Sequence, residues 1–214
     1  MEFIPSTSVL LQFTLASIIL TLTPGPDMTL FVGRSLSDGR AAGLACMAGA
    51  STGLVVHTIF VVAGLSALIV ASPAAFLAVK IAGAGYLVWL AVQAIRHGST
   101  FTPKTASGGK ARPLWKHWAT GLGVNLLNPK IIIFFMTFLP QFVSASDPHA
   151  PGKLLFLGLS FIVIALPFTI PMILAADGFS ALMRRNRTVT RAIDWLFAGV
   201  FSAFAVKILF TQSR

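Results

Sequence analysis

Six long apolar runs, separated by short polar connections, dominate this chain of 214 residues. Hydrophobic residues make up 56% of the sequence and charged residues only 10%. Soluble domains carry about 25% charged residues. A helix that spans a bilayer needs about 20 apolar residues, and each run is close to that length. The pattern therefore predicts an all-α integral membrane protein and excludes a soluble globular domain.

The six predicted spans leave little room for any other domain. Their approximate bounds are 8–32, 41–70, 74–95, 114–142, 154–176 and 193–210. We expect a single transmembrane domain over residues 1–214, in which two three-helix halves flank a basic, Gly/Ser/Pro-rich cytoplasmic loop; the halves are 1–95 and 114–214, and the loop is 96–113. Because each half has an odd number of spans, the two halves would be inverted repeats of each other.

The basic residues predict the orientation of the spans. Eleven of the 16 Lys and Arg residues lie in the connections after the first, third and fifth spans, and four lie on or near the opposite side. Basic loops stay in the cytoplasm, so both termini are expected outside it. The net charge of +10 is thus a topology signal, and nucleic-acid binding is a poor interpretation of it.

The first apolar run is interrupted by the sequence TPGPD, residues 23–27. A proline has no N–H group and its ring clashes with the preceding turn, so the helix must break or kink here. Within a bilayer, broken backbone is tolerated only where protein or a water-filled cavity satisfies the freed groups. We expect Thr23 to be the N-cap and Pro24 the first residue of a new half-helix, with Asp27 in its first turn.

Asp27 has a structural and a functional interpretation. Its negative charge suits the positive end of a helix dipole, which would make it simply an acid at a helix start. A carboxylate in the middle of a bilayer, however, costs about 3 kcal/mol or more, whereas the dipole returns about 0.3–1 kcal/mol. The functional interpretation is therefore favoured: Asp27 would hold a substrate ammonium group or carry a proton.

The fourth run carries a second break, Asn128-Pro129-Lys130, at the position that corresponds to the first break. Paired interrupted segments of this kind point to the binding site of a transporter. Asn128 and Pro129 fit an N-cap and a first helical position, but Lys130 then puts a positive charge against the helix dipole. Two interpretations remain: Lys130 and the free N–H groups bind a substrate carboxylate, or Lys130 pairs with Asp27 only to neutralise both.

Two further polar residues are candidates for the same pathway. His57 lies deep in the second run, where it could relay protons or serve as a hydrogen-bonded packing residue. Asn125 lies one turn before the second break and could line the same cavity. No zinc-ligand cluster, nucleotide-binding loop or nucleophile–base arrangement is present, so we expect no metal, no cofactor and no enzymatic activity.

Small residues at the start of the second run predict close helix packing. Gly49 and Gly53 form a GxxxG pattern, and small residues at this spacing let two helix backbones approach closely in lipid. The pattern favours packing within the chain, with a homo-oligomer interface as the alternative.

Three stretches of the chain resemble the lysine exporter (LysE/RhtB) family, in its homoserine/threonine-efflux branch. They are, in order, TLTPGPDMTLFVGRSLSDGRAAGLACMAGASTGLVVHTIF, KIAGAGYLVWLAVQAIR and NLLNPKIIIFFMTFLPQF. The resemblance implies a multi-pass protein of the bacterial inner membrane that exports amino acids or similar small metabolites, energised by the proton-motive force. By similarity, the two family motifs cover Pro24, Gly25, Pro26 and Asp27, and Asn128, Pro129 and Lys130.

Residues and resemblance together predict a secondary transporter that works by alternating access around the two breaks. The expected substrate and proton pathway consists of Pro24, Gly25, Pro26, Asp27, His57, Asn125, Asn128, Pro129 and Lys130. The expected partners are an amino acid, protons and the lipid bilayer. A hypothesis of another class is a channel or membrane assembly factor without coupled transport, which has no need of opposite charges at the breaks.

Overall fold

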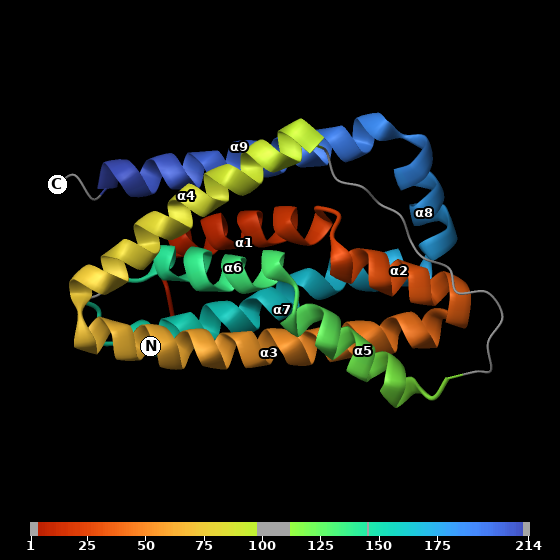
Figure 1. Ribbon diagram of the computed structural model, residues 1–214, viewed down its shortest axis with the longest axis horizontal. Coiled ribbons are helices and arrows are strands. Elements are labelled where there is room, and N and C mark those ends of the chain that lie inside the picture. The colour runs from red at the N-terminus through yellow and green to blue at the C-terminus, as the bar shows by residue number, and fades with distance from the viewer. Residues whose placement is uncertain (1–3, 98–111, 145, 212–214) are drawn as a thin grey trace.

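The computed structural model describes residues 4–97, 112–144 and 146–211 (Figure 1). Its elements are α1 (Thr7–Leu22), α2 (Pro26–Asp38), α3 (Arg40–Ala71), α4 (Pro73–His97), α5 (Leu114–Leu126), α6 (Pro129–Phe138), the 3₁₀ turn η1 (Leu139–Phe142), α7 (Ala150–Leu174), α8 (Ala176–Arg185) and α9 (Arg187–Thr211). No strand occurs among these residues, which confirms the all-α class. Most of the predicted loop 96–113 lies outside the described residues.

Two helices of the described chain, α3 and α7, are long and apolar enough to cross a membrane by themselves. Two bent pairs also qualify if each counts as one span: α1 with α2, bent by 51°, and α5 with α6 and η1, bent by 55°. The described residues thus contain two to four candidate spans. Helices α4 and α9 have 25 residues each, and neither is among the candidates found in the described residues, so the count of six spans stays a prediction.

The helices run back and forth between two ends of an elongated bundle (Figure 1). The α2–α3 turn and α8 lie at one end, and the α3–α4 turn lies at the other. Helix α4 packs along α9, while α3 packs against both α5 and α7. The bend between α1 and α2 and the bend between α5 and α6 both lie near the middle of the bundle. Two breaks far apart in the sequence are therefore brought to the same level.

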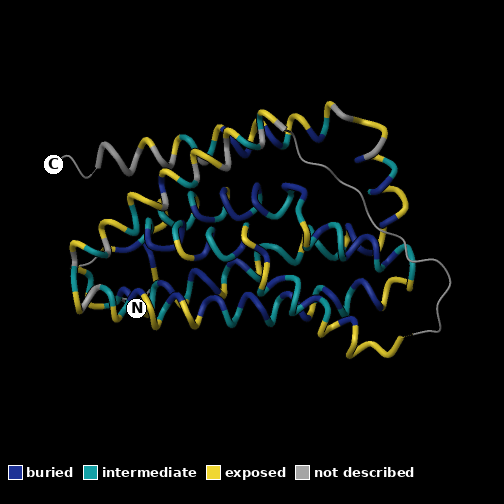
Figure 2. Tube along the Cα trace, in the orientation of Figure 1, coloured by how far each residue is buried: buried dark blue, intermediate teal, exposed yellow. Residues whose placement is uncertain are grey.

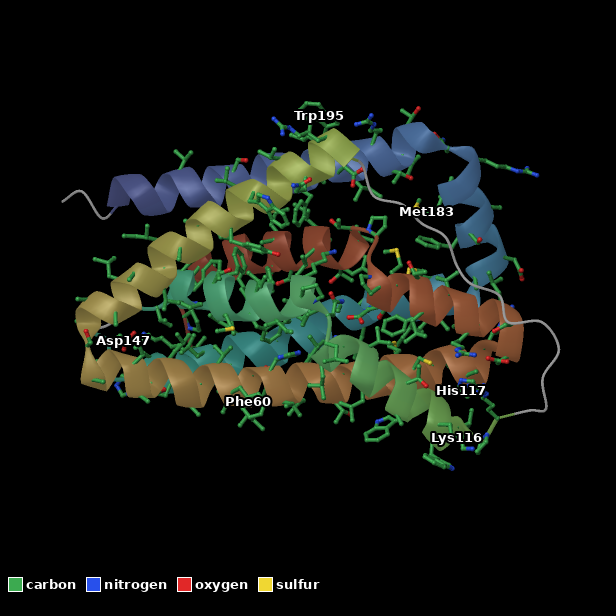
Figure 3. The ribbon with its side chains drawn as sticks, in the orientation of Figure 1. Phe60, Lys116, His117, Asp147, Met183 and Trp195 are labelled. Carbon is green, nitrogen blue, oxygen red and sulfur yellow. The ribbon has the colours of Figure 1, made fainter. Side chains whose placement is uncertain are left out.

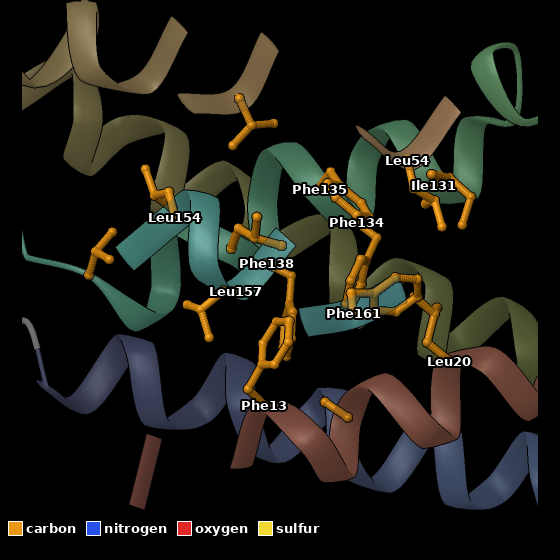
Figure 4. Packing of buried hydrophobic residues seen from close by; sticks show 14 of the residues in the cluster. Phe13, Leu20, Leu54, Ile131, Phe134, Phe135, Phe138, Leu154, Leu157 and Phe161 are labelled. Atoms are coloured by element: carbon orange, nitrogen blue, oxygen red, sulfur yellow. The ribbon is translucent and has the colours of Figure 1, made fainter. Parts of the chain in front are cut away.

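Two clusters of buried apolar side chains hold the helices together. In the larger cluster, Phe13 of α1, Phe134 and Phe138 of α6 and Phe161 of α7 pack ring against ring, with centroid distances from 4.6 to 6.2 Å (Figure 4). The smaller cluster joins α2, α3, α7 and α8, and its buried members are Met28, Phe31, Val32, Cys46, Ala50, Met172, Ile173, Ala176 and Met183.

The outer faces of the bundle are exposed and rich in apolar side chains, as contact with lipid requires. Exposed residues follow the outer sides of α3, α4, α5 and α9 (Figure 2), and large apolar examples are Phe60 of α3 and Trp195 of α9 (Figure 3). Polar residues lie at the ends, where Asp147 is far from Lys116 (Figure 3). The hydrogen bond from the Lys153 ammonium group, 2.5 Å long, holds the pKa of the Asp147 carboxyl below its ordinary value.

The small residues of α3 pack against α5 with backbone touching backbone. A Cβ atom built on Gly49 would lie 1.9 Å from the carbonyl oxygen of Trp118, and one built on Gly121 would lie 1.9 Å from that of Cys46. A Cβ atom on Gly53 would lie 2.5 Å from Oδ1 of Asn125. The GxxxG pattern is therefore used within the chain, as the favoured interpretation had it.

The basic segment 183–191 is helical, although the sequence pattern predicts a connector there. Helix α8 continues to Arg185, and α9 begins at Arg187, earlier than the predicted residue 193. Asn186 explains the difference, because its side-chain oxygen accepts a hydrogen bond from the N–H of Val189 at 3.3 Å. An asparagine in this position caps a new helix directly after the previous one has ended.

Replacing Gly49 by alanine should destabilise the bundle, because the new Cβ would overlap the Trp118 carbonyl and force α3 and α5 apart. Overpacking of this kind costs about 1–3 kcal/mol, so the melting temperature in detergent micelles should fall. Gly64→Ala is the matched control: it lies in the same helix, and nothing lies within 4 Å of its Cβ position. Equal melting temperatures for the two variants would contradict the contact between the backbones.

Candidate functional site

The first break separates α1 from α2. Helix α2 begins at Pro26 with Gly25 as its N-cap, so the expected N-cap Thr23 and the expected first residue Pro24 are wrong. Thr23 instead closes α1, because its N–H and its hydroxyl group both donate to the carbonyl of Ile19, at 3.0 and 2.7 Å. Thr23 is therefore the C-cap of α1, and Gly25 takes the N-cap position of α2.

The second break separates α5 from α6 as the sequence predicts. Asn128 is the N-cap of α6: its side-chain oxygen accepts a hydrogen bond from the N–H of Lys130 at 3.1 Å, and Pro129 is the first helical residue. The helix that follows each break therefore begins with a proline and then a charged residue, Pro26-Asp27 in α2 and Pro129-Lys130 in α6.

At each break a proline removes the N–H donor of a carbonyl group one turn earlier in the chain. In an α-helix a carbonyl accepts from the N–H four residues further on, and proline has no N–H. Pro24 therefore deprives the carbonyl of Leu20, and Pro129 deprives the carbonyl of Asn125. Because a bilayer offers no water to such groups, carbonyls at a break take their partners from within the protein.

The side chain of Lys130 supplies the donors that the first break lacks. Its Nζ atom donates to the carbonyl of Leu20 at 3.3 Å and to that of Thr23 at 2.9 Å. Lys130 thus opposes the dipole of its own helix but places its charge at the C-terminal, negative end of α1. Among the described ion pairs, none joins Lys130 directly to Asp27.

His57 of α3 has the corresponding place at the second break. Its Nε2 atom lies 3.3 Å from the carbonyl oxygen of Asn125, which also accepts from the N–H of Asn128 at 3.1 Å. A carbonyl oxygen can only accept, so this contact requires the proton to be on Nε2. His57 thus joins α3 to the end of α5 by a hydrogen bond.

Asp27 lies in the first turn of α2, as predicted, and contacts the helix that precedes the second break. Its Oδ2 accepts a hydrogen bond from Nδ2 of Asn125 at 2.7 Å, which joins α2 to α5. The other oxygen, Oδ1, is buried and has no hydrogen-bond partner within the described residues, and the same holds for Oδ1 of Asn125. Buried polar atoms without a partner are uncommon and mark places for water or a ligand.

A cavity of about 80 Å³ lies against both breaks. The volume counted is the space open to the centre of a water molecule, of which a single water needs about 10–15 Å³. The cavity therefore has room for several waters or part of a small solute. Five of the nine expected site residues line it: Gly25, Asp27, Asn125, Asn128 and Lys130. The other four shape the backbone of the breaks or hold Asn125.

Two residues of α9 that the sequence pattern did not single out lie close to Lys130. The Nζ atom of Lys130 lies 5.9 Å from the centre of the Phe197 ring, in a cation–π contact. Asp194, one turn earlier in α9, is buried and within range of an electrostatic interaction with Lys130. An acid within an apolar stretch is a signal that could have found Asp194.

These features define a helical membrane protein with two facing helix breaks and a partly polar cavity beside them. Within the described residues, no group of three or more His, Cys, Asp or Glu side chains could hold a metal ion. A family model of the LysE type translocators matches residues 18–212, and the chain therefore belongs to this family.

Known proteins are similar to this chain over almost their whole length. A homoserine/homoserine lactone efflux protein of Salmonella typhimurium is 30% identical over 189 residues, 88% of this chain and 90% of the relative. A leucine efflux protein of Klebsiella pneumoniae is 27% identical over 210 residues, 95% of each. An uncharacterized membrane protein of Vibrio cholerae is 30% identical over 193 residues, 90% of this chain and 92% of the relative. No solved structure matches the chain significantly. The family resemblance seen in the sequence motifs is confirmed.

Replacing Lys130 by methionine should destabilise the protein, because two carbonyl groups lose their donor while the apolar stem is kept. A buried carbonyl without a partner costs about 1–3 kcal/mol, so the melting temperature in detergent should fall. Lys153→Met is the control: it breaks the partly exposed ion pair with Asp147 at one end of the bundle, and such a surface pair contributes little.

A second background tests whether the loss at Lys130 comes from the first break. Pro24→Ala restores an N–H group four residues after Leu20, so Lys130→Met should cost less in a Pro24→Ala protein than in the unmodified one. Strictly additive effects of the two substitutions would mean that Lys130 does not replace the missing donor.

Proposed function

We propose that this protein is a secondary transporter that exports amino acids or similar small metabolites across the bacterial inner membrane, driven by the proton-motive force. Its membership of the LysE type translocators and its similarity to two kinds of efflux protein support this class of activity. In the proposed mechanism, the cavity at the two breaks opens alternately to the two sides of the membrane.

The proposed transporter is one domain of six spans over residues 1–214, built from two inverted halves, 1–95 and 114–214. In this architecture each bent pair is one span, and α4 and α9 are spans as well. The proline and the charged residue that begin α2 recur at the start of α6, as expected of equivalent positions in a repeat. The excess of Lys and Arg in alternate connections favours both termini outside the cytoplasm.

The observation that carries the proposal is that both charges at the cavity are only partly hydrogen-bonded. Asp27 has one carboxylate oxygen bound to Asn125 and one without a partner among the described residues. The Lys130 ammonium group has three N–H donors and uses two of them on carbonyl groups. One negative acceptor and one positive donor therefore remain for a ligand, and a zwitterionic amino acid carries the matching pair.

In the proposed cycle, Asp27 binds either the α-ammonium group of the substrate or a proton. Since the two compete for one carboxylate, a proton that arrives from outside displaces the substrate there, and a substrate that arrives from the cytoplasm displaces the proton. Lys130 attracts the substrate carboxylate. His57 belongs to the pathway through its bond to the Asn125 carbonyl, which helps to place the Asn125 amide on Asp27.

Asp27→Asn should reduce pH-gradient-driven efflux to the background level, because an amide neither carries the proton nor neutralises an ammonium group. The measurement is efflux of labelled leucine or homoserine from proteoliposomes against its own gradient. Asp147→Asn, a change of the same kind in a loop outside the cavity, should keep full activity (Figure 3). Unchanged efflux in Asp27→Asn would remove Asp27 from the mechanism.

The same assay separates the transporter from the hypothesis of a channel or membrane assembly factor. A coupled transporter moves the solute uphill when a pH gradient is imposed, and collapse of that gradient stops it. Flux that only runs downhill would point to a channel, and no flux of any amino acid would favour an assembly factor.

A further inference from the structure

The lining of the cavity falls into two groups of side chains. The polar group comes from the breaks and contains the four residues Asp27, Asn125, Asn128 and Lys130. The apolar group comes largely from α2, α3 and α7, and its larger side chains include Met28, Phe31, Met47, Phe161, Leu166 and Met172. A bound amino acid would therefore meet both kinds of surface.

Most hydroxyl groups in the lining already donate within their own helices. Thr21, Thr23 and Thr169 each donate to the carbonyl four residues earlier, at 2.7, 2.7 and 3.0 Å. Ser51 is the one other hydroxyl among the described lining residues. The cavity thus offers few free hydroxyl donors to a solute that carries a hydroxyl group of its own.

The charged groups of the lining are limited to the two at the breaks. Asp27 and Lys130 are its only charged residues within the described chain, and the ammonium and carboxylate groups of an amino acid would occupy both. No additional charge is then left in the lining for a basic or acidic side chain of the solute. A charged side chain buried without a partner is strongly disfavoured.

The methionines of the apolar group provide an adaptable surface. Met28 and Met172 belong to the smaller core cluster, and Met47 packs against it. The sulfur of Met47 lies 3.5 Å from the hydroxyl of Thr169, so that residues of α3 and α7 meet at the cavity. Methionine side chains are flexible and fit irregular apolar shapes.

Building on the proposed function, we infer that the exported solute is an amino acid with an apolar side chain, such as that of leucine or methionine. Its ammonium and carboxylate groups bind at the breaks, and its side chain packs against the methionine, phenylalanine and leucine residues named above. Hydroxylated amino acids such as homoserine and threonine bind more weakly because their hydroxyl groups would face the apolar part of the lining, and lysine is excluded by its charge.

Counterflow exchange in proteoliposomes tests this inference. Vesicles preloaded with unlabelled leucine or homoserine take up the labelled form of each, and leucine, methionine, homoserine, threonine and lysine are added outside as competitors. An apolar pocket discriminates by about 10–200-fold, so leucine and methionine should inhibit at concentrations at least tenfold below homoserine and threonine. Equal or stronger inhibition by homoserine or threonine would overturn the inference but leave amino-acid export standing. Failure of every amino acid to exchange would overturn both.

Variants of the apolar group give a readout that does not depend on how much protein folds. Met47→Gln and Met172→Gln bring an amide into the lining at nearly the same length, and the ratio of leucine to homoserine exchange should fall about fivefold or more. Met136→Gln is the control, since Met136 is exposed and lies outside this cavity, and it should leave the ratio unchanged. Thr169→Val keeps the shape and removes an engaged hydroxyl, so its ratio should be unchanged or higher. A fall in the ratio for Thr169→Val, or none for the two methionine variants, would contradict the inference.

Discussion

A proline in an apolar helix leaves one carbonyl group without its donor, and the protein has to supply another donor when no water is available. Side chains from distant segments contact such carbonyls at both breaks: Lys130 at the Leu20 carbonyl, and His57 at the Asn125 carbonyl, which also accepts from the N–H of Asn128. Apolar contacts between helices tolerate small shifts, whereas a hydrogen bond to a particular carbonyl does not. The arrangement around the cavity thus depends on these two bonds more than on any single pair of apolar side chains.

The two breaks are hydrogen-bonded to each other, so that α1, α2, α5 and α6 form a closed ring of covalent and hydrogen-bonded links. The backbone joins α1 to α2 and α5 to α6, while Lys130 of α6 binds the end of α1 and Asn125 of α5 binds Asp27 of α2. Asp27 and Lys130 occupy the same position after a helix-starting proline but carry opposite charges. The charge that opposes its own helix dipole is the one that reaches the carbonyl end of a neighbouring helix. Its placement looks unfavourable in the sequence and becomes favourable in the fold.

The sequence predicted the all-α class, both breaks and the family, because apolar runs, prolines and motifs are local features. The cap at Asn128 was right, whereas the cap at Thr23 was wrong: prolines at positions 24 and 26 allow two starts, and the bond of Thr23 back to Ile19 decides between them. The partners of Lys130 and His57 lie 110 and 68 residues away along the chain, beyond the reach of any local pattern. Asp194 was missed because it stands at the predicted edge of the last span, and only the longer α9 places it beside Lys130.

The glycine contact between α3 and α5 limits which parts of the molecule can move. Where backbone meets backbone at Gly49 and Gly121, the two helices cannot slide past each other without collision, so we expect them to move together. The link between α5 and α6 lies outside this contact, at a proline where the helix is bent by 55°, so it can serve as a hinge. A rotation of α6 about that hinge would withdraw Lys130 from the end of α1. The hydrogen bonds from Lys130 to the end of α1 would have to break for such a motion to occur.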